Sequence, residues 1–381
     1  MNRLIIFIFC VSFVGCQKSS PVSEVIEKPD TLTHIRYATG FNVRYDQDVK
    51  WIEVPAPFQG ATSGFKYLLV PNGVAVPSHD ADVRVITIPL TSIVCTSTTH
   101  IPLLDYLGET DKLTGFPTTD YISSEKMRMR VEEGKVTELG IDKGLNLERL
   151  AVLKPGMVMG YTTSNDFGQF KKVEELGVPV VINAEYLEKH PLGRAEWIKF
   201  MALFFNKERE ADSVFSIIEK NYNQTKSIAA AAKDRPTVLS GIVYGSAWFM
   251  PGGKNYAATL LRDANCHYLW EDDPTNGFLE LSFESVYQKA HEAAFWIGVG
   301  SFTTLNEIKL ADERYSKFKP FQQKQVYNYD ARQGAKGGSE YMELGYLRPD
   351  IILNDLVLIA HPELKDSLSE KNLYFHRVLP D

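Results

Sequence analysis

The stretch NLERLAVLKPGMVM at residues 146–159 has the pattern of a short helix that leads directly into an apolar strand. Glu148 lies in the first turn of this helix, ten residues before the strand that starts near Val158. The same order recurs later in the chain, where Glu284 lies ten residues before a strand that starts near Ala294. A helix–strand unit that occurs twice indicates two lobes of related construction.

Short apolar strands alternate with helices on both sides of this stretch, which predicts parallel sheets covered by helices. The expected strands are 83–88, 157–161, 178–182, 237–243, 294–299 and 325–329. The expected helices are 101–107, 255–263, 283–290, 304–318 and a last one that starts at Pro349 and ends before Pro362. Residues 32–80 are rich in strands, such as Val49–Val54 and 67–70, and form an elaboration of the first lobe.

A long helix is expected between the lobes, over residues 194–226. From Trp197 onward, apolar residues recur at steps of three, four or seven, which places them on one helical face. A coiled-coil dimer would use a similar seam, but Glu208 interrupts it, and four heptads within an α/β chain suit a spine better.

The fold class is therefore α/β, with two lobes that each contain a mainly parallel sheet flanked by helices and are joined by one long spine helix. The expected organisation is a signal peptide at 1–15, a lipidated tether at 16–30, an N-terminal lobe at 31–190, the spine at 191–233 and a C-terminal lobe with a returning helix at 234–381.

Length and charge agree with this organisation. The chain has 381 residues, more than one ordinary core requires, and its formal net charge is −7, with 41 basic and 48 acidic side chains. This mild acidic balance offers no electrostatic reason to expect nucleic-acid binding.

The N-terminus predicts export and lipidation. Arg3 precedes an apolar run at 4–14, which is typical of a signal peptide, and the run ends in Phe13-Val14-Gly15-Cys16. This ending resembles the lipobox of bacterial lipoproteins, in which the cysteine is acylated, although leucine is usual where Phe13 stands. A cleaved secretory signal with an incidental cysteine is the alternative. The polar residues 17–30 suit a flexible tether.

The sequence has no motif of an enzyme or of a metal site. Gly252-Gly253-Lys254-Asn255 lacks the first glycine and the hydroxyl residue of a phosphate loop, and the histidines are scattered without metal-ligand spacing. Cys95 and Cys266 are far apart, so they form either an interlobe disulfide or, more in keeping with their surroundings, two buried thiols. We therefore expect no catalytic residue, no metal and no cofactor.

Several blocks resemble class III periplasmic binding proteins, the receptors of ABC importers for cobalamin and iron–siderophore complexes. These blocks are NLERLAVLKPGMVM at 146–159, VRVITIPL at 83–90, LGVPVVI at 176–182, GRAEWIKFMALFFNKEREAD from Gly193, FMPGGKNYAATLLRDAN at 249–265 and LRPDIILNDL at 347–356. Their order and spacing are more specific than any single block. Gly156 departs from the family, which usually has aspartate there.

The resemblance implies a role for the paired glutamates. In this family one glutamate on each lobe docks with arginines of the membrane permease, and Glu148 and Glu284 occupy the matching positions. The alternative is structural, because an acidic residue in the first turn stabilises a helix through its macrodipole.

Ligand contacts are expected from loops at the carboxyl ends of the strands, where parallel sheets bind ligands. Aromatic rings on these loops suit a large flat ligand, and Arg332 suits an anionic group. Trp248 and Phe249 have a plainer alternative, which is to pack the loop beneath them. The candidate residues are Tyr161, Thr162, Tyr244, Trp248, Phe249, Tyr256 and Arg332.

The resulting hypothesis is a lipoprotein of the periplasm, anchored to the cell membrane or the outer membrane, that delivers its ligand to an ABC permease and ATPase. Ferric siderophore is the first expectation for the ligand and cobalamin the second, with haem or another chelate behind them. Two other functions stay open: a chelatase-like enzyme of similar architecture, against which the export signal argues, and a capture lipoprotein without a permease.

Overall fold

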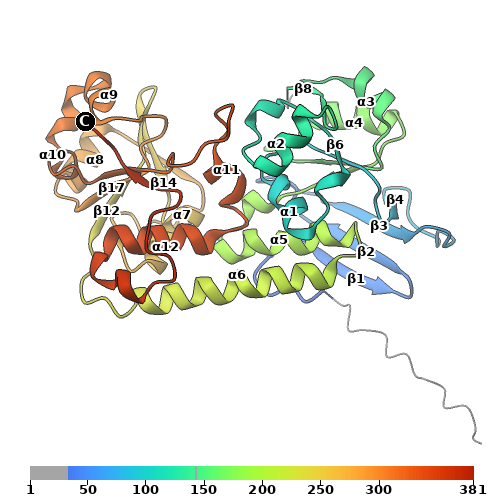
Figure 1. Ribbon diagram of the computed structural model, residues 1–381, viewed down its shortest axis with the longest axis horizontal. Helices are drawn as coiled ribbons and strands as arrows, with labels where there is room; N and C mark the ends of the chain where they lie inside the picture. Colours follow the sequence, from blue (N-terminus) through green and yellow to red (C-terminus); the bar gives the residue numbers. More distant parts are fainter. Residues whose placement is uncertain (1–32, 142–143) are drawn as a thin grey trace, which may run out of the picture. The chain divides into compact units, whose positions relative to one another are not determined.

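The computed structural model describes residues 33–141 and 144–381, and it contains two α/β lobes (Figure 1). The predicted signal peptide, Cys16 and the tether lie outside the described residues. Residues 32–381 form a compact unit of their own.

The N-terminal lobe is built on a five-stranded parallel sheet of order β11-β10-β5-β6-β7. Its strands are β5 (Ile93–Cys95), β6 (Leu113–Phe116), β7 (Thr137–Glu138), β10 (Val158–Gly160) and β11 (Val180–Ile182). The helices of this lobe are α1 (His100–Leu107), α2 (Glu125–Glu132), α3 (Leu147–Leu153) and α4 (Gly168–Glu175), with short 3₁₀ turns η1 (Thr110–Lys112), η2 (Thr119–Tyr121) and η3 (Glu185–Leu187). Two short strands, β8 (Gly140–Ile141) and β9 (Gly144–Leu145), pair antiparallel.

The C-terminal lobe has a second five-stranded sheet, of order β15-β12-β17-β18-β19, in which only β19 runs antiparallel. Its strands are β12 (Thr237–Ser240), β15 (His267–Tyr268), β17 (Phe295–Ile297), β18 (Val326–Asn328) and β19 (Arg377–Val378). An antiparallel sheet accompanies it, formed by β13 (Ile242–Tyr244), β14 (Ala247–Pro251) and β16 (Phe278–Leu281). The helices are α7 (Tyr256–Asp263), α8 (Phe283–Ala290), α9 (Leu305–Ala311), α10 (Lys319–Gln322), α11 (Glu340–Leu344) and α12 (Pro349–Ala360), with η4 (Glu313–Lys317) and η5 (Pro362–Ser367).

This arrangement confirms the fold class, and most elements lie where the pattern predicts them. One expected strand, 237–243, is divided between β12 and β13, which belong to different sheets. Gly241 separates them with φ of +80°, and a Cβ there would lie 1.9 Å from the carbonyl oxygen of Phe249. Only glycine fits this turn.

The strand-rich region before the N-terminal lobe forms a separate four-stranded sheet of order β1-β2-β3-β4, comprising β1 (Asn42–Asp46), β2 (Val49–Val54), β3 (Phe65–Pro71) and β4 (Arg84–Ile88). The strand expected at 83–88 therefore pairs with β3 and lies outside the main sheet of the lobe. The main sheet takes its central strand, β5, from residues 93–95, which are not among the strands expected from the sequence.

The expected spine at residues 194–226 is two helices, α5 (Pro191–Leu203) and α6 (Glu208–Ala229), so the prediction of a continuous helix is wrong at its middle. The side chain of Lys50, from β2, is buried at the break. Its amino group donates to the carbonyl oxygen of Leu203 (2.9 Å) and to Asn206 Oδ1 (2.8 Å), and it pairs with Glu208. Asn206 has a left-handed φ of 56°, which ends the first helix. The longer helix α6 contacts α1, α5 and α12, and so joins both lobes (Figure 1).

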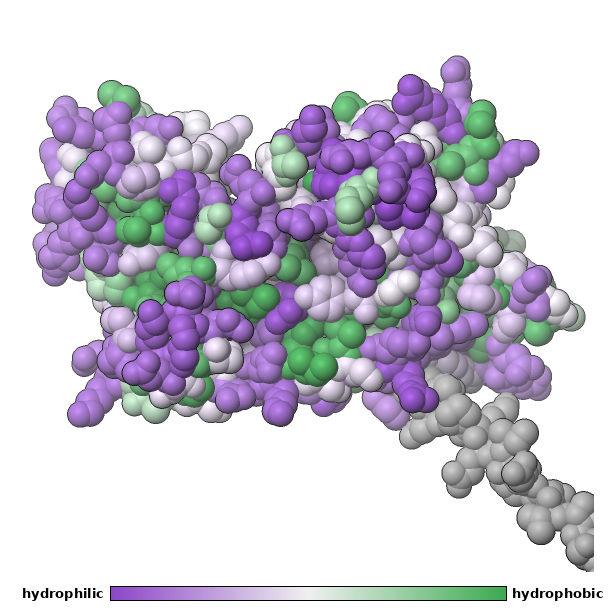
Figure 2. Space-filling view, in the orientation of Figure 1, coloured by the Kyte–Doolittle hydropathy of each residue, from purple (hydrophilic) through white to green (hydrophobic). Residues whose placement is uncertain are grey.

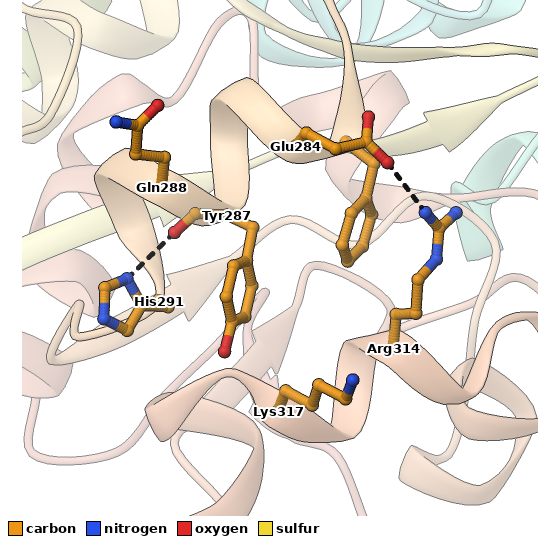
Figure 3. A pocket seen from close by; sticks show the side chains of 7 residues that line it. Glu284, Tyr287, Gln288, His291, Arg314 and Lys317 are labelled. Atoms are coloured by element: carbon orange, nitrogen blue, oxygen red, sulfur yellow. Dashed lines mark hydrogen bonds and ion pairs between the residues drawn. The ribbon is translucent and has the colours of Figure 1, made fainter.

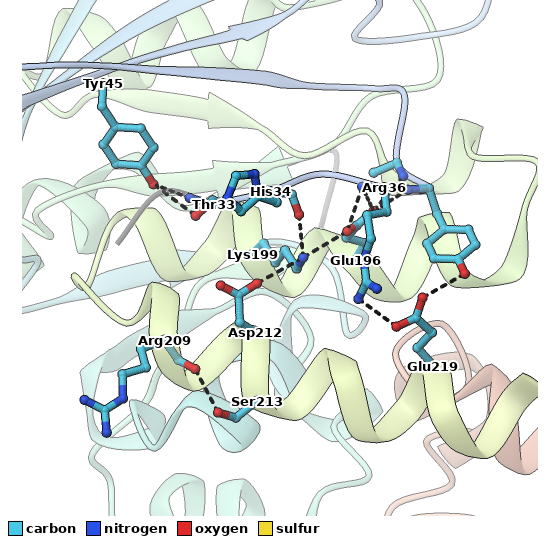
Figure 4. Close-up of polar contacts among 12 residues, drawn as sticks. Thr33, His34, Arg36, Tyr45, Glu196, Lys199, Arg209, Asp212, Ser213 and Glu219 are labelled. Carbon is cyan, nitrogen blue, oxygen red and sulfur yellow. Dashed lines mark hydrogen bonds and ion pairs between the residues drawn. The ribbon is translucent and has the colours of Figure 1, made fainter. Parts of the chain in front are cut away.

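Residues 33–40 are held on α5 by buried charges (Figure 4). Glu196 accepts hydrogen bonds from the backbone N–H groups of Arg36, Tyr37 and Ala38, at 2.7–3.0 Å. Lys199 pairs with Glu196 and Asp212, both at 3.0 Å. These contacts satisfy charges that burial would otherwise penalise, and they anchor the start of the described chain.

The surface is mostly hydrophilic on the face shown in Figure 2, with apolar residues gathered only in small patches. Within the described part of the chain, no helix has the length and hydropathy needed to cross a bilayer.

Candidate functional site

Glu148 and Glu284 occupy the same position in two equivalent helices. Glu148 is the second residue of α3, which Asn146 caps by accepting the N–H of Arg149 (3.0 Å). Glu284 is the second residue of α8, which Ser282 caps by accepting the N–H of Ser285 (3.2 Å). The strands that follow, β10 and β17, are interior strands of the two main sheets. The repeat seen in the sequence is therefore a structural repeat, and both carboxylates are exposed.

The surroundings of Glu284 combine charge with aromatic rings (Figure 3). Its carboxylate accepts a hydrogen bond from Arg314 (3.0 Å), and Arg314 also pairs with Asp312 and lies over the ring of Phe283. A hollow of about 440 Å³ adjoins this group. It is lined by Phe283, Glu284, Tyr287, Gln288, His291, Arg314 and Lys317.

Glu148 lies in a simpler setting. It lines a hollow of about 350 Å³ together with Thr137, Arg149, Val152 and Leu153. Val152 is 85% exposed and contributes apolar surface to this hollow. Each paired glutamate therefore borders a surface hollow with apolar walls, a setting in which a partner's side chain could be received.

Tyr161 and Thr162 follow β10, at the carboxyl edge of the N-terminal sheet, as expected. Tyr161 is half-buried. Thr162 is buried, and its hydroxyl donates to the carbonyl oxygen of Ser164 (2.8 Å) within a tight turn. Tyr186 donates to the carbonyl oxygen of Thr162 (2.8 Å), so Thr162 shapes the loop and presents little side chain to a ligand.

The hydroxyl groups that follow β5 bond to one another and to a buried acid. Ser97 and Thr99 share a hydrogen bond (2.9 Å), and Thr99 donates to Glu185 (2.5 Å). Burial raises the pKa of Glu185. The neighbouring His100 is fully buried, which lowers its pKa to about 3, so its ring is uncharged at neutral pH.

Tyr244, Trp248 and Phe249 are close in sequence, but the hairpin of β13 and β14 places them in different environments. Tyr244, at the turn, is 80% exposed, and Phe249 is half-buried with its ring centroid 6.2 Å from that of Tyr244. Trp248 is fully buried: its ring stacks on Trp296 at 5.4 Å, and its indole N–H donates to the carbonyl oxygen of Ser240 (3.0 Å). The structure thus places Trp248 in the core, where a ligand cannot reach it, and its alternative packing role applies.

Tyr256 is also buried. The guanidinium of Arg194 lies 3.9 Å from the centroid of its ring and 4.4 Å from that of Tyr346, so the arginine is held between two tyrosines. Burial raises the pKa of Tyr256 well above its ordinary value. Tyr256 therefore packs α7 against α5, and a direct ligand contact is not supported.

Arg332 lies on the loop that follows β18, at the carboxyl edge of the C-terminal sheet. It is exposed, pairs with Glu340 (2.9 Å) and lies over the ring of Tyr374. This arrangement orients the guanidinium while leaving it open to solvent. Tyr244, Phe249 and Arg332 are thus the accessible members of the predicted set in this lobe.

The described part of the chain holds neither a disulfide nor a group of metal-ligating side chains. Cys95 and Cys266 are both buried free thiols, and burial raises the pKa of Cys266 to about 12. Among residues 33–141 and 144–381, no group of three His, Cys, Asp or Glu side chains is arranged to hold a metal ion. Cys16 lies outside the described residues.

Sequence reasoning missed Glu343, which joins the two lobes. It lies on α11, is 2% exposed and accepts hydrogen bonds from the backbone of Ser123 and Ser124. Nothing in the local pattern signals this role, because the partners are 219 and 220 residues away.

Residues 93–333 match the family model described as periplasmic binding protein. Among curated proteins, the chain is similar to an uncharacterised lipoprotein of Methanocaldococcus jannaschii, with 26% identity over 353 residues that cover 86% of this chain and 82% of the relative.

Solved structures show the same fold at low sequence identity. A possible iron-binding, periplasmic solute-binding protein from Staphylococcus epidermidis aligns with a TM-score of 0.57 and 17% identity, covering 72% of this chain and all of that one. The periplasmic haem-binding protein HutB of Vibrio cholerae aligns with a TM-score of 0.53 and 15% identity, covering 69% of this chain and 99% of that one.

Proposed function

This chain belongs to the periplasmic binding protein family, and from that premise we propose that it captures an iron–siderophore complex between its lobes and docks on a permease through Glu148 and Glu284. The general function follows from the family itself: the chain is a substrate-binding protein of an ABC transporter and is not an enzyme. Such a protein has a small-molecule ligand and a permease–ATPase partner.

The observation that carries the docking proposal is the equivalence of the two glutamates. Each is the second residue of a capped helix, exposed beside a hollow, and each precedes an interior strand of its own lobe. Charged groups at the rim of an interface mainly set orientation and encounter rate. Two carboxylates on different lobes let one rigid partner recognise that both lobes are correctly placed.

The docking test is the double change Glu148→Arg with Glu284→Arg. It should abolish ligand uptake by cells and leave the affinity of the purified protein for its ligand unchanged. Glu370→Arg, an exposed acidic position after η5 of the C-terminal lobe, is the control and should transport normally. Normal uptake by the double variant would favour a capture lipoprotein without a permease.

The choice of ligand rests on less specific features. The exposed ring of Tyr244 and the half-buried ring of Phe249 offer flat apolar area, and Arg332 offers a cation for an anionic chelate. These features suit a ferric siderophore first, then cobalamin and then haem. The structural neighbours named for iron and haem support a chelated metal as the ligand class.

Equilibrium dialysis of residues 17–381 against ferric siderophores, cyanocobalamin and haemin distinguishes these ligands. Excess colour in the protein compartment for one of them would identify the ligand class. Tyr244→Ala should weaken that retention, because it removes an exposed ring, whereas Phe278→Ala removes an exposed ring on the edge strand β16 and serves as a control. Retention of none of the three would exclude the proposed ligands.

We further propose that Cys16 carries the lipid that holds the protein at a membrane, in keeping with the lipoprotein name of its relative. Mass spectrometry of the protein purified from membranes should show an acylated N-terminal cysteine. Cys16→Ala should release the protein into the soluble fraction. A wild-type N-terminus without acyl groups would contradict the proposal.

A further inference from the structure

A segment of the C-terminal lobe lies directly against the N-terminal lobe. We call residues 332–347, between β18 and α12, the arm; it contains α11. Two glycines of the arm approach the other lobe so closely that no side chain would fit. A Cβ at Gly338 would lie 2.1 Å from the carbonyl oxygen of Tyr121, and a Cβ at Gly334 would lie 2.6 Å from Cα of Ser123.

Glu343 fastens the arm at this place. One carboxylate oxygen accepts the N–H of Ser123 (2.7 Å), and the other accepts the N–H of Ser124 (2.8 Å). Ser124 is also the N-cap of α2, so the carboxylate lies at the positive end of that helix. Glu343 is almost fully buried, as is Ser123, so loss of the carboxylate would leave the N–H of Ser123 unpaired in the interior.

Both ends of this contact belong to ligand-facing loops. Residues 117–124 follow β6, and the arm follows β18, so each starts from the carboxyl end of a parallel strand in its lobe. Ligands bind at this edge of such sheets. Tyr121 and Arg332, two exposed side chains of these segments, are therefore held in relation to each other by Glu343.

Two further contacts cross between the lobes near the arm. Arg348, at the start of α12, donates to the hydroxyl oxygen of Tyr106 on α1 (2.9 Å). Arg194 of α5 lies between the rings of Tyr256 and Tyr346, and Tyr346 belongs to the arm. Arg194 in turn donates to the carbonyl oxygen of Tyr186 (2.9 Å), near the carboxyl end of β11. The arm is thus attached at several points, of which Glu343 is the most buried.

We propose that Glu343 is a positioning residue for ligand capture: it holds the ligand-facing loops of the two lobes at one separation, so that the ligand enters a site that is already formed. The link to ligand capture rests on the proposed function, whereas the attachment of the arm stands on the contacts alone. Preorganisation of this kind reduces the ordering cost of binding.

The test measures the separation of the lobes. A protein of residues 17–381 is spin-labelled at Glu133→Cys and Lys309→Cys, which are exposed positions on different lobes. The distance between the two labels reports the separation of the lobes. The native Cys95 and Cys266 are buried and should not be labelled. The parent should give one narrow distance distribution. Glu343→Ala should broaden it, and the amides of Ser123 and Ser124 should exchange hydrogen about tenfold faster.

Glu340→Ala is the matched control. Glu340 lies on the same helix but bonds to Arg332 and Tyr374 within its own lobe, so its loss should leave the distribution narrow. Glu343→Gln keeps one acceptor and should show an intermediate change, which covers the case in which the alanine variant does not fold. Unchanged distributions in folded Glu343 variants, or equal broadening in Glu340→Ala, would overturn the proposal.

The ligand measurement separates this proposal from the general function. For a ligand retained in the dialysis, Glu343→Ala should weaken affinity about tenfold if only a tenth of the molecules keep the binding-competent separation. Unchanged affinity with broadened distances would overturn the positioning role. Absence of any retained ligand would count against the proposed function and leave the distance test of the arm intact.

Discussion

Aromatic side chains that are close in sequence differ in burial in this protein. The difference depends on the residues that pack around each ring. Trp248 and Phe249 are adjacent on β14, where successive side chains point to opposite faces of the strand. The first enters a cluster with Trp296 and Phe318, and the second is half-buried. Tyr244, at the hairpin turn, is the most exposed of the three. The composition of the segment predicts aromatic contacts without revealing which ring is accessible.

Glu343 makes a residue-scale prediction about pH. Burial raises the pKa of its carboxyl from an ordinary value of 4.5 to about 7, although the N–H groups of Ser123 and Ser124 act in the opposite direction and nearby Asp105 adds to the rise. Because the folded pKa is the higher one, the stability contribution is complete below pH 4.5 and is lost as pH rises through 7. A difference of this size corresponds to roughly 3 kcal/mol.

Urea unfolding at pH 5 and pH 8 checks this prediction. Glu343→Gln cannot ionise, so its free energy of unfolding relative to wild type should increase by roughly 2–3 kcal/mol between these pH values. Equal pH dependence in the two proteins would contradict the raised pKa.

At the scale of elements, the break between α5 and α6 is a place where a strand that is distant in sequence contacts the ends of two helices. The apolar spacing from Trp197 onward continues across the break, although Asn206 is a residue type that ends helices. Lys50 of β2 lies at the break, where its buried amino group is paired with acceptors of Leu203, Asn206 and Glu208. Burial lowers the pKa of Lys50, while the Glu208 carboxylate acts against that shift.

Removal of Lys50 should therefore be costly. Lys50→Ala leaves the buried carboxylate of Glu208 without its cation, for which we expect a loss of about 3–5 kcal/mol in the free energy of unfolding. Lys66→Ala, an exposed lysine on β3 of the same sheet, should change stability by less than about 0.5 kcal/mol. The double variant Lys50→Met with Glu208→Leu should recover much of the loss, since it removes both charges together. Equal stability of Lys50→Ala and Lys66→Ala would contradict a stabilising role of the buried ion pair.

At the scale of the whole molecule, several connections limit movement of the lobes. The helix α6 contacts α1 of one lobe and α12 of the other, and the arm adds the contacts of Glu343 and Arg348. A hinge made of a few flexible strands would have none of these constraints. We therefore expect a site that is largely formed before the ligand arrives.

Small-angle scattering of the free and the ligand-bound protein tests this expectation. The radius of gyration should be nearly the same in both states, because the two lobes are already held together by α6 and by the arm. The Glu343→Ala variant should show a larger difference between its two states than the Glu340→Ala control. A marked compaction of the wild-type protein on ligand binding would contradict a preformed site.

The sequence by itself determined the α/β class, the two lobes, the positions of most helices and the equivalence of Glu148 and Glu284. These properties follow from periodicity and from capping, which depend on near neighbours in the chain. The match of the family model to residues 93–333 confirms the family that the ordered motifs indicated. The tertiary structure alone decided how Lys50 is paired at the break of the spine, which aromatic rings are accessible and how Glu343 joins the lobes. Each of these outcomes depends on a buried polar or aromatic group whose partner lies far away in the chain. Such partners are determined by the need to satisfy buried hydrogen bonds and to fill space in the interior. The residues adjacent in sequence do not reveal which distant groups will meet these needs.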